Sequence, residues 1–131
     1  MIQRVEIPQT SKTPLIVLDP GKGKILIKGR YILHDVDERA NFIGNVLENI
    51  NIIFPQMVGN INVDVYYIYV NTGNLQAFFS IFKTIESLST TQQNITINWY
   101  YEGDDDEDAI EKGEILGNLI TLPVNLIDVG D

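Results

Sequence analysis

The sequence predicts an α/β domain with a mixed β-sheet, an N-terminal β-hairpin and about three helices. Two observations favour this class. Short β-rich runs near the N-terminus are separated by turn residues, and the later extended runs alternate with segments of helical period. The chain has 131 residues, with 44% hydrophobic and 21% charged residues, so we expect one domain spanning residues 1–131.

The first elements are extended. Val5–Ile7 is expected to be a short edge strand that ends at Pro8. Leu15–Asp19 and Lys24–Gly29 are expected to pair as a β-hairpin, because the segment between them carries the Pro and Gly residues of a tight turn.

The rest of the chain alternates between helical and extended segments. These are a helix from Asp37 to before Pro55, a strand over Ile61–Val70, a helix over Leu75–Leu88, a strand over Asn94–Tyr101, a third helix from Ala109 to Ile120, and a short strand over Val124–Val129. Such alternation implies parallel crossovers and hence a mixed sheet. Ile61–Val70 is so apolar that we expect a central strand covered on both faces.

Composition excludes several classes of function. Lys and Arg total 9 against 18 Asp and Glu, so the net charge is -9, which disfavours nucleic acid and anionic membranes as ligands. The chain has no cysteine and one histidine, His34, which excludes thiolate chemistry and a multi-histidine metal site. No apolar run approaches the ~20 residues of a membrane helix, and no signal peptide is recognised, so we expect a cytoplasmic protein. No phosphate-binding glycine motif or GxSxG element occurs, and no cofactor is expected.

An acidic segment precedes the third helix. It places eight acids within 13 positions: Glu102, Asp104, Asp105, Asp106, Glu107, Asp108, Glu111 and Glu114. Acids favour a helix start, where free N–H groups and the positive dipole end lie, but two or three would suffice. The excess is compatible with a partner-facing surface or with a divalent-metal site. An EF-hand loop fails, because its sixth and twelfth positions would be Ala109 and Ile115.

A second candidate site is Asn71-Thr72-Gly73-Asn74, which follows the predicted central strand and opens a helix. In α/β sheets this is a preferred place for function. Thr72 or Asn74 is a candidate N-cap, whose side chain would accept a backbone N–H. Alternatively, Thr72 is a phosphorylation target, since a phosphate is tolerated at the positive end of a helix.

These segments together resemble the SiaC family of regulatory phosphoproteins. The residues that carry the resemblance are Asn98-Trp99-Tyr100-Tyr101-Glu102, Asp104–Asp108, Glu111-Lys112-Gly113-Glu114, Tyr69-Val70-Asn71-Thr72, and, more weakly, the opening hairpin with Thr13-Pro14, Leu18-Asp19-Pro20 and Ile27-Lys28-Gly29-Arg30. They span most of the chain in the family's order.

The resemblance implies a fold similar to the STAS domain of anti-sigma-factor antagonists, and regulation by partner switching. A kinase phosphorylates the family's threonine, which is Thr72 here, and a PP2C-type phosphatase removes the phosphate. The unphosphorylated form binds and activates a diguanylate cyclase and so influences cyclic-di-GMP and biofilm behaviour. On this basis the partner-binding residues are Asn71, Gly73, Asn74, Asp104, Asp105, Asp106, Glu107 and Asp108.

The sequence departs from the family pattern at two places. Gly73-Asn74 replaces the usual Ser-Ser after the threonine, and Tyr31–Asp35 replaces the usual Ser-Tyr-Pro-Glu-Asn element. These departures bear on which kinase or effector is recognised. Two alternative functions are a metal-dependent enzyme that uses the carboxylates and a plain interaction scaffold without phosphorylation.

Overall fold

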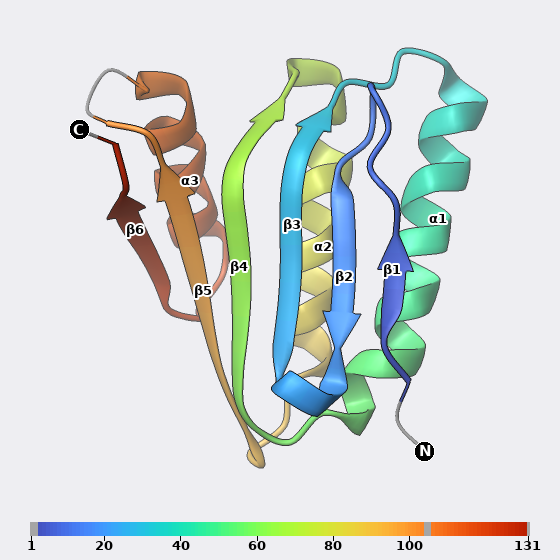
Figure 1. Cartoon of the computed structure of the whole chain (residues 1–131), viewed down its shortest axis with the longest axis vertical. Coiled ribbons are helices and arrows are strands. Elements are labelled where there is room, and N and C mark those ends of the chain that lie inside the picture. Colours follow the sequence, from blue (N-terminus) through green and yellow to red (C-terminus); the bar gives the residue numbers. More distant parts are fainter. Residues whose placement is uncertain (1–2, 104–105, 131) are drawn as a thin grey trace.

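A six-stranded mixed sheet forms the centre of the molecule, and the helices pack against one of its faces (Figure 1). The computed structural model describes residues 3–103 and 106–130. Its strands are β1 (Val5–Ile7), β2 (Leu15–Asp19), β3 (Lys24–Tyr31), β4 (Gly59–Val70), β5 (Gln93–Tyr101) and β6 (Val124–Asp128). The α-helices of these residues are α1 (Val36–Ile53), α2 (Leu75–Leu88) and α3 (Glu107–Leu119), with 3₁₀ turns η1 (Pro20–Lys22), η2 (Phe54–Gln56) and η3 (Thr72–Asn74).

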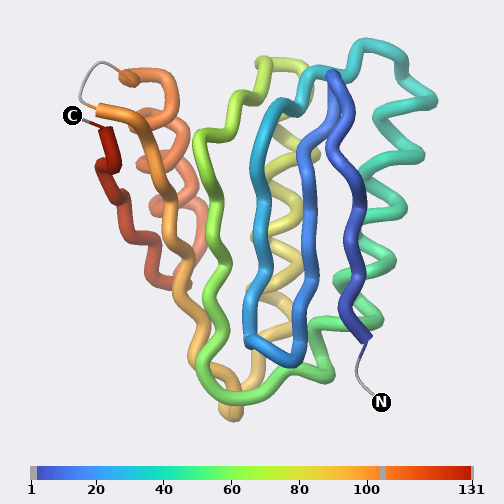
Figure 2. The backbone as a smooth tube through the Cα atoms, in the orientation of Figure 1, coloured from blue at the N-terminus to red at the C-terminus, as the bar shows by residue number. Residues whose placement is uncertain are grey.

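The strands lie in the sheet in the order in which they occur in the chain, from β1 to β6. The first two pairings are antiparallel and the last three are parallel, which confirms the predicted hairpin and the mixed sheet. Figure 2 shows that β3 to β6 run in one direction, so their carboxyl ends share one edge. Because crossovers are almost always right-handed, adding strands in a single direction places every helix on the same face.

The hairpin turn depends on one glycine. Asp19 accepts a hydrogen bond from the Lys22 backbone N–H at 3.2 Å, and Gly23 ends the turn in a left-handed conformation with φ of 61°. A Cβ at Gly23 would lie 2.6 Å from the carbonyl oxygen of Asn60 on β4. The glycine is therefore needed both for the turn and for the approach of β4 to this end of β3.

The prediction that the central strand is covered on both faces is wrong. β4 is central and its helix-facing side is buried, but on the other side Asp64 alone is buried and Tyr69 is 52% exposed. A bulge interrupts the in–out alternation of the strand: Lys28 pairs with Tyr66 whereas Arg30 pairs with Tyr69, and Tyr67 has a φ of 47°. The extra residue shifts the alternation, so the tyrosines before and after it lie on the open face.

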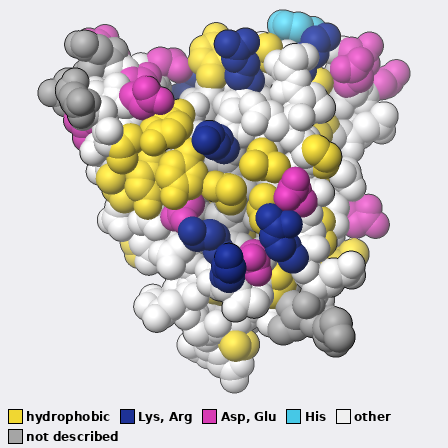
Figure 3. Space-filling model, viewed as in Figure 1, with side chains coloured by type: hydrophobic (Ala, Val, Ile, Leu, Met, Phe, Trp, Pro, Cys, Tyr) yellow, Lys and Arg dark blue, Asp and Glu magenta, His cyan; other side chains and the backbone are white. Residues whose placement is uncertain are grey.

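An aromatic patch therefore lies on the open face of the sheet, over the upper parts of β4 and β5 (Figure 3). The rings of Tyr66 and Tyr100 stack with centroids 4.4 Å apart and planes at 10°. Asn98 and Asp64, lower on the same two strands, are joined by a hydrogen bond of 2.9 Å, and Lys24 of β3 pairs with Asp64 at 3.3 Å. The open face thus carries one large aromatic area beside a mixture of charged, polar and smaller hydrophobic areas (Figure 3).

The core lies between the sheet and the helices, and aromatic rings fill its centre. Phe78 of α2 contacts Tyr31 of β3 and Trp99 of β5, with centroid distances of 6.3 and 6.0 Å. The edge-on arrangement of these rings is the favoured one for aromatic pairs. No helix within residues 3–103 and 106–130 is both long enough and apolar enough to cross a bilayer.

We expect Tyr31→Phe to leave the free energy of unfolding unchanged or raise it by about 1 kcal/mol. The Tyr31 hydroxyl is buried without a hydrogen-bond partner among the described residues, and burial raises the pKa of this phenol from 10.0 to about 12. The folded protein therefore holds this proton more tightly than the unfolded chain. The protonated Tyr31 phenol therefore makes a contribution to the free energy of unfolding that is present below pH 10 and is lost as the pH rises towards about 12.

Urea denaturation at about pH 8 and about pH 11 measures both effects. The wild type should lose stability between the two pH values by more than the phenylalanine variant does. A variant that is more than about 1 kcal/mol less stable than the wild type at the lower pH would show that the hydroxyl has a stabilising partner.

Candidate functional site

Thr72 lies in the connection between β4 and α2. The strand ends at Val70, Asn71 follows, and η3 begins at Thr72 directly before the helix. Thr72 is exposed, and in the described part of the chain no hydrogen bond engages its hydroxyl. The connection lies at the edge where the parallel strands end (Figure 1). The hydroxyl is therefore accessible to the active site of another protein, as a modification site requires.

Asn74 holds this connection against the end of β3. Its side chain is fully buried, and its Nδ2 donates to the Leu33 carbonyl oxygen at 2.9 Å and to the Asn71 side-chain oxygen. The predicted N-cap is wrong: no side chain caps η3 or α2, because the Asn74 amide points inward and donates. Its burial also places Asn74 out of a partner's reach, although it was predicted to be a partner contact.

The backbone adds two further ties. The Asn71 N–H donates to the Tyr31 carbonyl oxygen at 3.3 Å, and the Asn74 N–H donates to the Asn71 carbonyl oxygen at 3.0 Å. The first bond joins the connection to the last residue of β3, and the second closes the turn. Thr72 and Gly73 are left as the exposed residues between two anchored asparagines.

A guanidinium lies beside the same connection. Arg39, near the start of α1, donates from Nε to the Leu33 carbonyl oxygen at 2.8 Å, so this carbonyl receives both Arg39 and Asn74. A Cβ at Gly73 would lie 2.7 Å from Arg39 Nη2. Gly73, one of the departures from the family pattern, therefore leaves room for the arginine.

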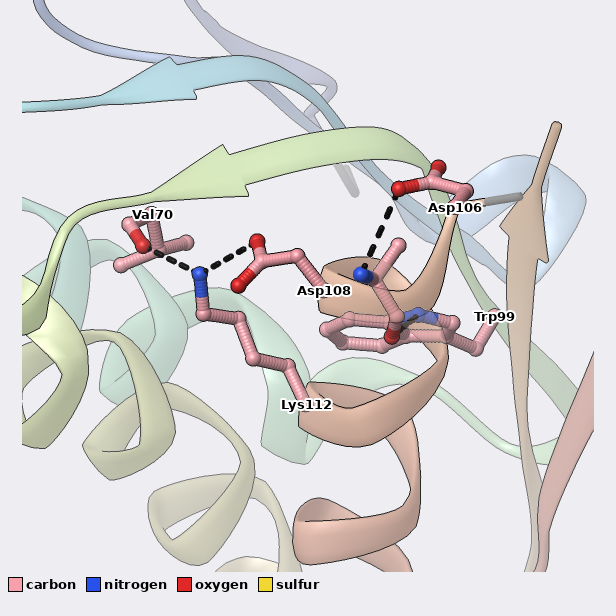
Figure 4. Close-up of polar contacts among 6 residues, drawn as sticks. Val70, Trp99, Asp106, Asp108 and Lys112 are labelled. Atoms are coloured by element: carbon pink, nitrogen blue, oxygen red, sulfur yellow. Dashed lines mark hydrogen bonds and ion pairs between the residues drawn. The ribbon is translucent and has the colours of Figure 1, made fainter.

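Lys112 of α3 approaches the end of β4 from the other side (Figure 4). Its side chain is largely buried, and Nζ donates to the Val70 carbonyl oxygen at 2.5 Å and to Asp108 Oδ2 at 2.7 Å. Nζ also lies 5.4 Å from the centroid of the Tyr69 ring. Because Val70 is two residues before Thr72, Lys112 links the acidic start of α3 to the threonine connection.

The acidic segment is in part a helix start. Asp106 is the N-cap of α3 and accepts from the Ala109 N–H at 3.4 Å, and Glu107 and Asp108 occupy the first turn. Their negative charges face the positive end of the helix dipole. Glu107 and Asp108 are exposed, so they also remain available to a partner. Asp104 and Asp105, predicted to be partner-binding residues, lie outside the described residues.

Metal chemistry finds no support in the described ranges. No three carboxylate or imidazole side chains among residues 3–103 and 106–130 come together as a metal site. His34 is exposed at the surface beside Asp35, which caps α1 by accepting from the Glu38 N–H at 3.0 Å.

Sequence reasoning identified Thr72 and the acids but missed the two cations near them. Lys112 lies four residues after Asp108, the spacing of an ion pair on one helix face, and this was a usable signal. Arg39 gave no comparable signal, because it meets Gly73 only through the packing of α1 beside η3. Thr72 thus lies in a connection that Arg39 approaches at Gly73 and Lys112 contacts at Val70.

Comparisons by sequence and by structure point to the same family of known proteins. The model of the SiaC family, described as SiaC family regulatory phosphoprotein, matches residues 7–129. No curated protein matches this sequence. The solved structure of apo-SiaC from Pseudomonas aeruginosa aligns with a TM-score of 0.76 and 17% identity, over 96% of this chain and 99% of that one.

In a second solved structure, the related protein is bound to a partner. A chain in the crystal structure of the diguanylate cyclase SiaD in complex with its activator SiaC, from Pseudomonas aeruginosa, aligns with a TM-score of 0.78 and 19% identity, over 95% of this chain and 98% of that one. Identities this low show a common fold, here the mixed sheet with its helices. The family model, by contrast, matches nearly the whole sequence, and this chain therefore belongs to the SiaC family of regulatory phosphoproteins.

Proposed function

We propose that this protein is a non-enzymatic signalling switch of the cytoplasm, a single regulatory domain whose phosphorylation on Thr72 controls its binding to a diguanylate cyclase. A protein kinase adds the phosphate and a PP2C-type phosphatase removes it. The observation that carries the proposal is the exposed Thr72 hydroxyl at the β4–α2 connection, in a member of a family of regulatory phosphoproteins. The complex of SiaD with its activator SiaC supports a cyclase as the effector.

The mechanism acts through charge at one surface. A phosphothreonine carries about -1.5 to -2 charge at neutral pH. The surrounding chain already has a net charge of -9, and Glu107 and Asp108 lie exposed at the same end of the sheet. We infer that the cyclase docks on a surface formed by Asn71, Thr72 and Gly73 with the acidic stretch Asp104–Asp108. Adding a dianion to this surface opposes docking through the cost of desolvating the phosphate and through its bulk at an interface formed with the bare hydroxyl.

The first test is phosphate transfer to the full chain. The protein is incubated with ATP, magnesium and the kinase from the source cell, and its intact mass is measured. We expect the wild type and Thr90→Ala to gain one phosphate, and Thr72→Ala to gain none. Thr90 is a matched control, because it is a second exposed threonine, beyond the other end of α2. Equal phosphate uptake by Thr72→Ala, or none by the wild type, contradicts the proposal.

The second test is binding to the cyclase. Phosphorylated wild type should bind the purified cyclase at least about tenfold more weakly than unphosphorylated wild type, which corresponds to about 1.4 kcal/mol. Treatment with the phosphatase should restore the affinity. Unchanged affinity after phosphorylation would show that Thr72 does not control docking.

A further inference from the structure

Arg39 is held in a fixed position next to the Thr72 connection. Its Nε donates to the Leu33 carbonyl oxygen at 2.8 Å, and the same oxygen accepts from the buried Asn74 side chain at 2.9 Å. The arginine and the connection therefore share one anchor. A long side chain restrained at Nε keeps its guanidinium plane, and with it the direction of its terminal N–H groups.

The terminal nitrogens of Arg39 lie at the residue that follows Thr72. The position that a Cβ would take at Gly73 is 2.7 Å from Nη2 and 3.5 Å from Nη1. In the described part of the chain neither nitrogen has a hydrogen-bond acceptor, since the only hydrogen bond of this side chain is that of Nε. Arg39 thus presents unused donors next to the threonine.

Several other charged groups nearby are of the wrong sign or are already engaged. The start of α1 carries Asp35, Asp37 and Glu38, and Arg39 is the first cation along it. Lys112, on the other side of the connection, already donates to the Val70 carbonyl and to Asp108. Arg39 is therefore a cation with free donors at the connection itself, whereas the exposed Arg30 pairs with Tyr69 on the open face of the sheet.

We propose that Arg39 receives the phosphate of phosphorylated Thr72 and binds it through its Nη groups. This inference rests on the proposed phosphorylation of Thr72. Arginine suits the role because its planar fork donates two parallel, charge-assisted hydrogen bonds to phosphate oxygens. The phosphate then does more than oppose docking: it is drawn towards α1 and pins the exposed Thr72-Gly73 segment to that helix.

The test measures the pKa of the phosphate itself. Full-length protein with phosphothreonine installed at position 72 during synthesis, so that no kinase is needed, is titrated by ³¹P NMR. An adjacent guanidinium stabilises the dianion, so the second pKa of the phosphate should lie about one unit lower in the wild type than in Arg39→Gln. Arg4→Gln, a remote guanidinium paired with Glu6 and Asp19, is the matched control and should behave as the wild type.

An equal phosphate pKa in the wild type and in Arg39→Gln overturns the proposal. Should Arg39→Gln fail to fold, the ¹⁵N signals of the arginine side chains in the wild type give the same answer. Phosphorylation must then shift the Arg39 signals, and unchanged signals overturn the proposal. Because the phosphate is installed at synthesis, failure here leaves the kinase and cyclase experiments standing, and failure of the kinase experiment does not alter this measurement.

Discussion

Replacing Trp99 by alanine is expected to lower the free energy of unfolding by about 3–5 kcal/mol. Trp99 is fully buried on β5, and its ring packs edge-on against Phe78 with centroids 6.0 Å apart. Its Nε1 donates to the Ala109 carbonyl oxygen in α3 at 2.9 Å. The substitution therefore opens a cavity between the sheet and two helices and removes the hydrogen bond that positions the start of α3. Urea denaturation followed by circular dichroism measures the loss.

Two further variants serve as comparisons for Trp99→Ala. Trp99→Phe keeps an aromatic ring but loses the hydrogen bond. We therefore expect its free energy of unfolding to fall by less than half as much as that of Trp99→Ala. Tyr69→Ala removes an aromatic side chain from the open face of the neighbouring strand, where it is half-exposed, and should cost less than about 1.5 kcal/mol. A loss in Trp99→Ala no larger than that in Tyr69→Ala would show that the sheet and α3 do not depend on this ring.

The second large effect is expected for Lys112→Met, at about 2 kcal/mol. Methionine preserves the buried apolar stem but removes the donor to the Val70 carbonyl oxygen and the partner of Asp108. Asp108 is 58% exposed and remains solvated, so most of the cost comes from the carbonyl. Amide hydrogen exchange should also accelerate at Asn71 and Asn74, because the end of β4 loses its tie to α3.

Lys83→Met provides the matched control. Lys83 is an exposed lysine on α2, and the same change of charge there should leave both stability and exchange nearly unaltered. If Lys112→Met and Lys83→Met gave the same stability and the same exchange rates, the contact of Lys112 with Val70 would have no energetic role.

Turn residues and hydrophobic spacing within short segments were enough to predict the strands, the helices and the position of Thr72. The Pro-Gly turn after Asp19 predicted the hairpin, and the spacing of Phe78, Phe82 and Ile85 predicted the face of α2 that is buried. Thr72 was identified because it follows an apolar strand and precedes a helix, and this placement needs no knowledge of distant contacts.

The features that escaped prediction depend on contacts between distant segments. The bulge at Tyr67 shifts the alternation of inward and outward side chains along β4. The hydrophobic pattern of the sequence does not reveal this shift, so it predicts a strand buried on both sides. Asn74 has the composition of a cap, but the Leu33 carbonyl, 41 residues earlier, offers a buried acceptor and turns its side chain inward. Local propensity was overridden in both places by packing between elements.

The agreement between strand order and chain order bears on how the protein is made. After the opening hairpin, each strand joins the edge left by the strand before it, and none inserts between two that are already paired. During synthesis, a strand leaving the ribosome therefore finds its hydrogen-bonding neighbour already in place, and folding proceeds by addition at a growing edge. The contacts of Arg39 and Asn74 with the Thr72 connection can therefore form once α2 has emerged, whereas the contact of Lys112 with Val70 waits for α3.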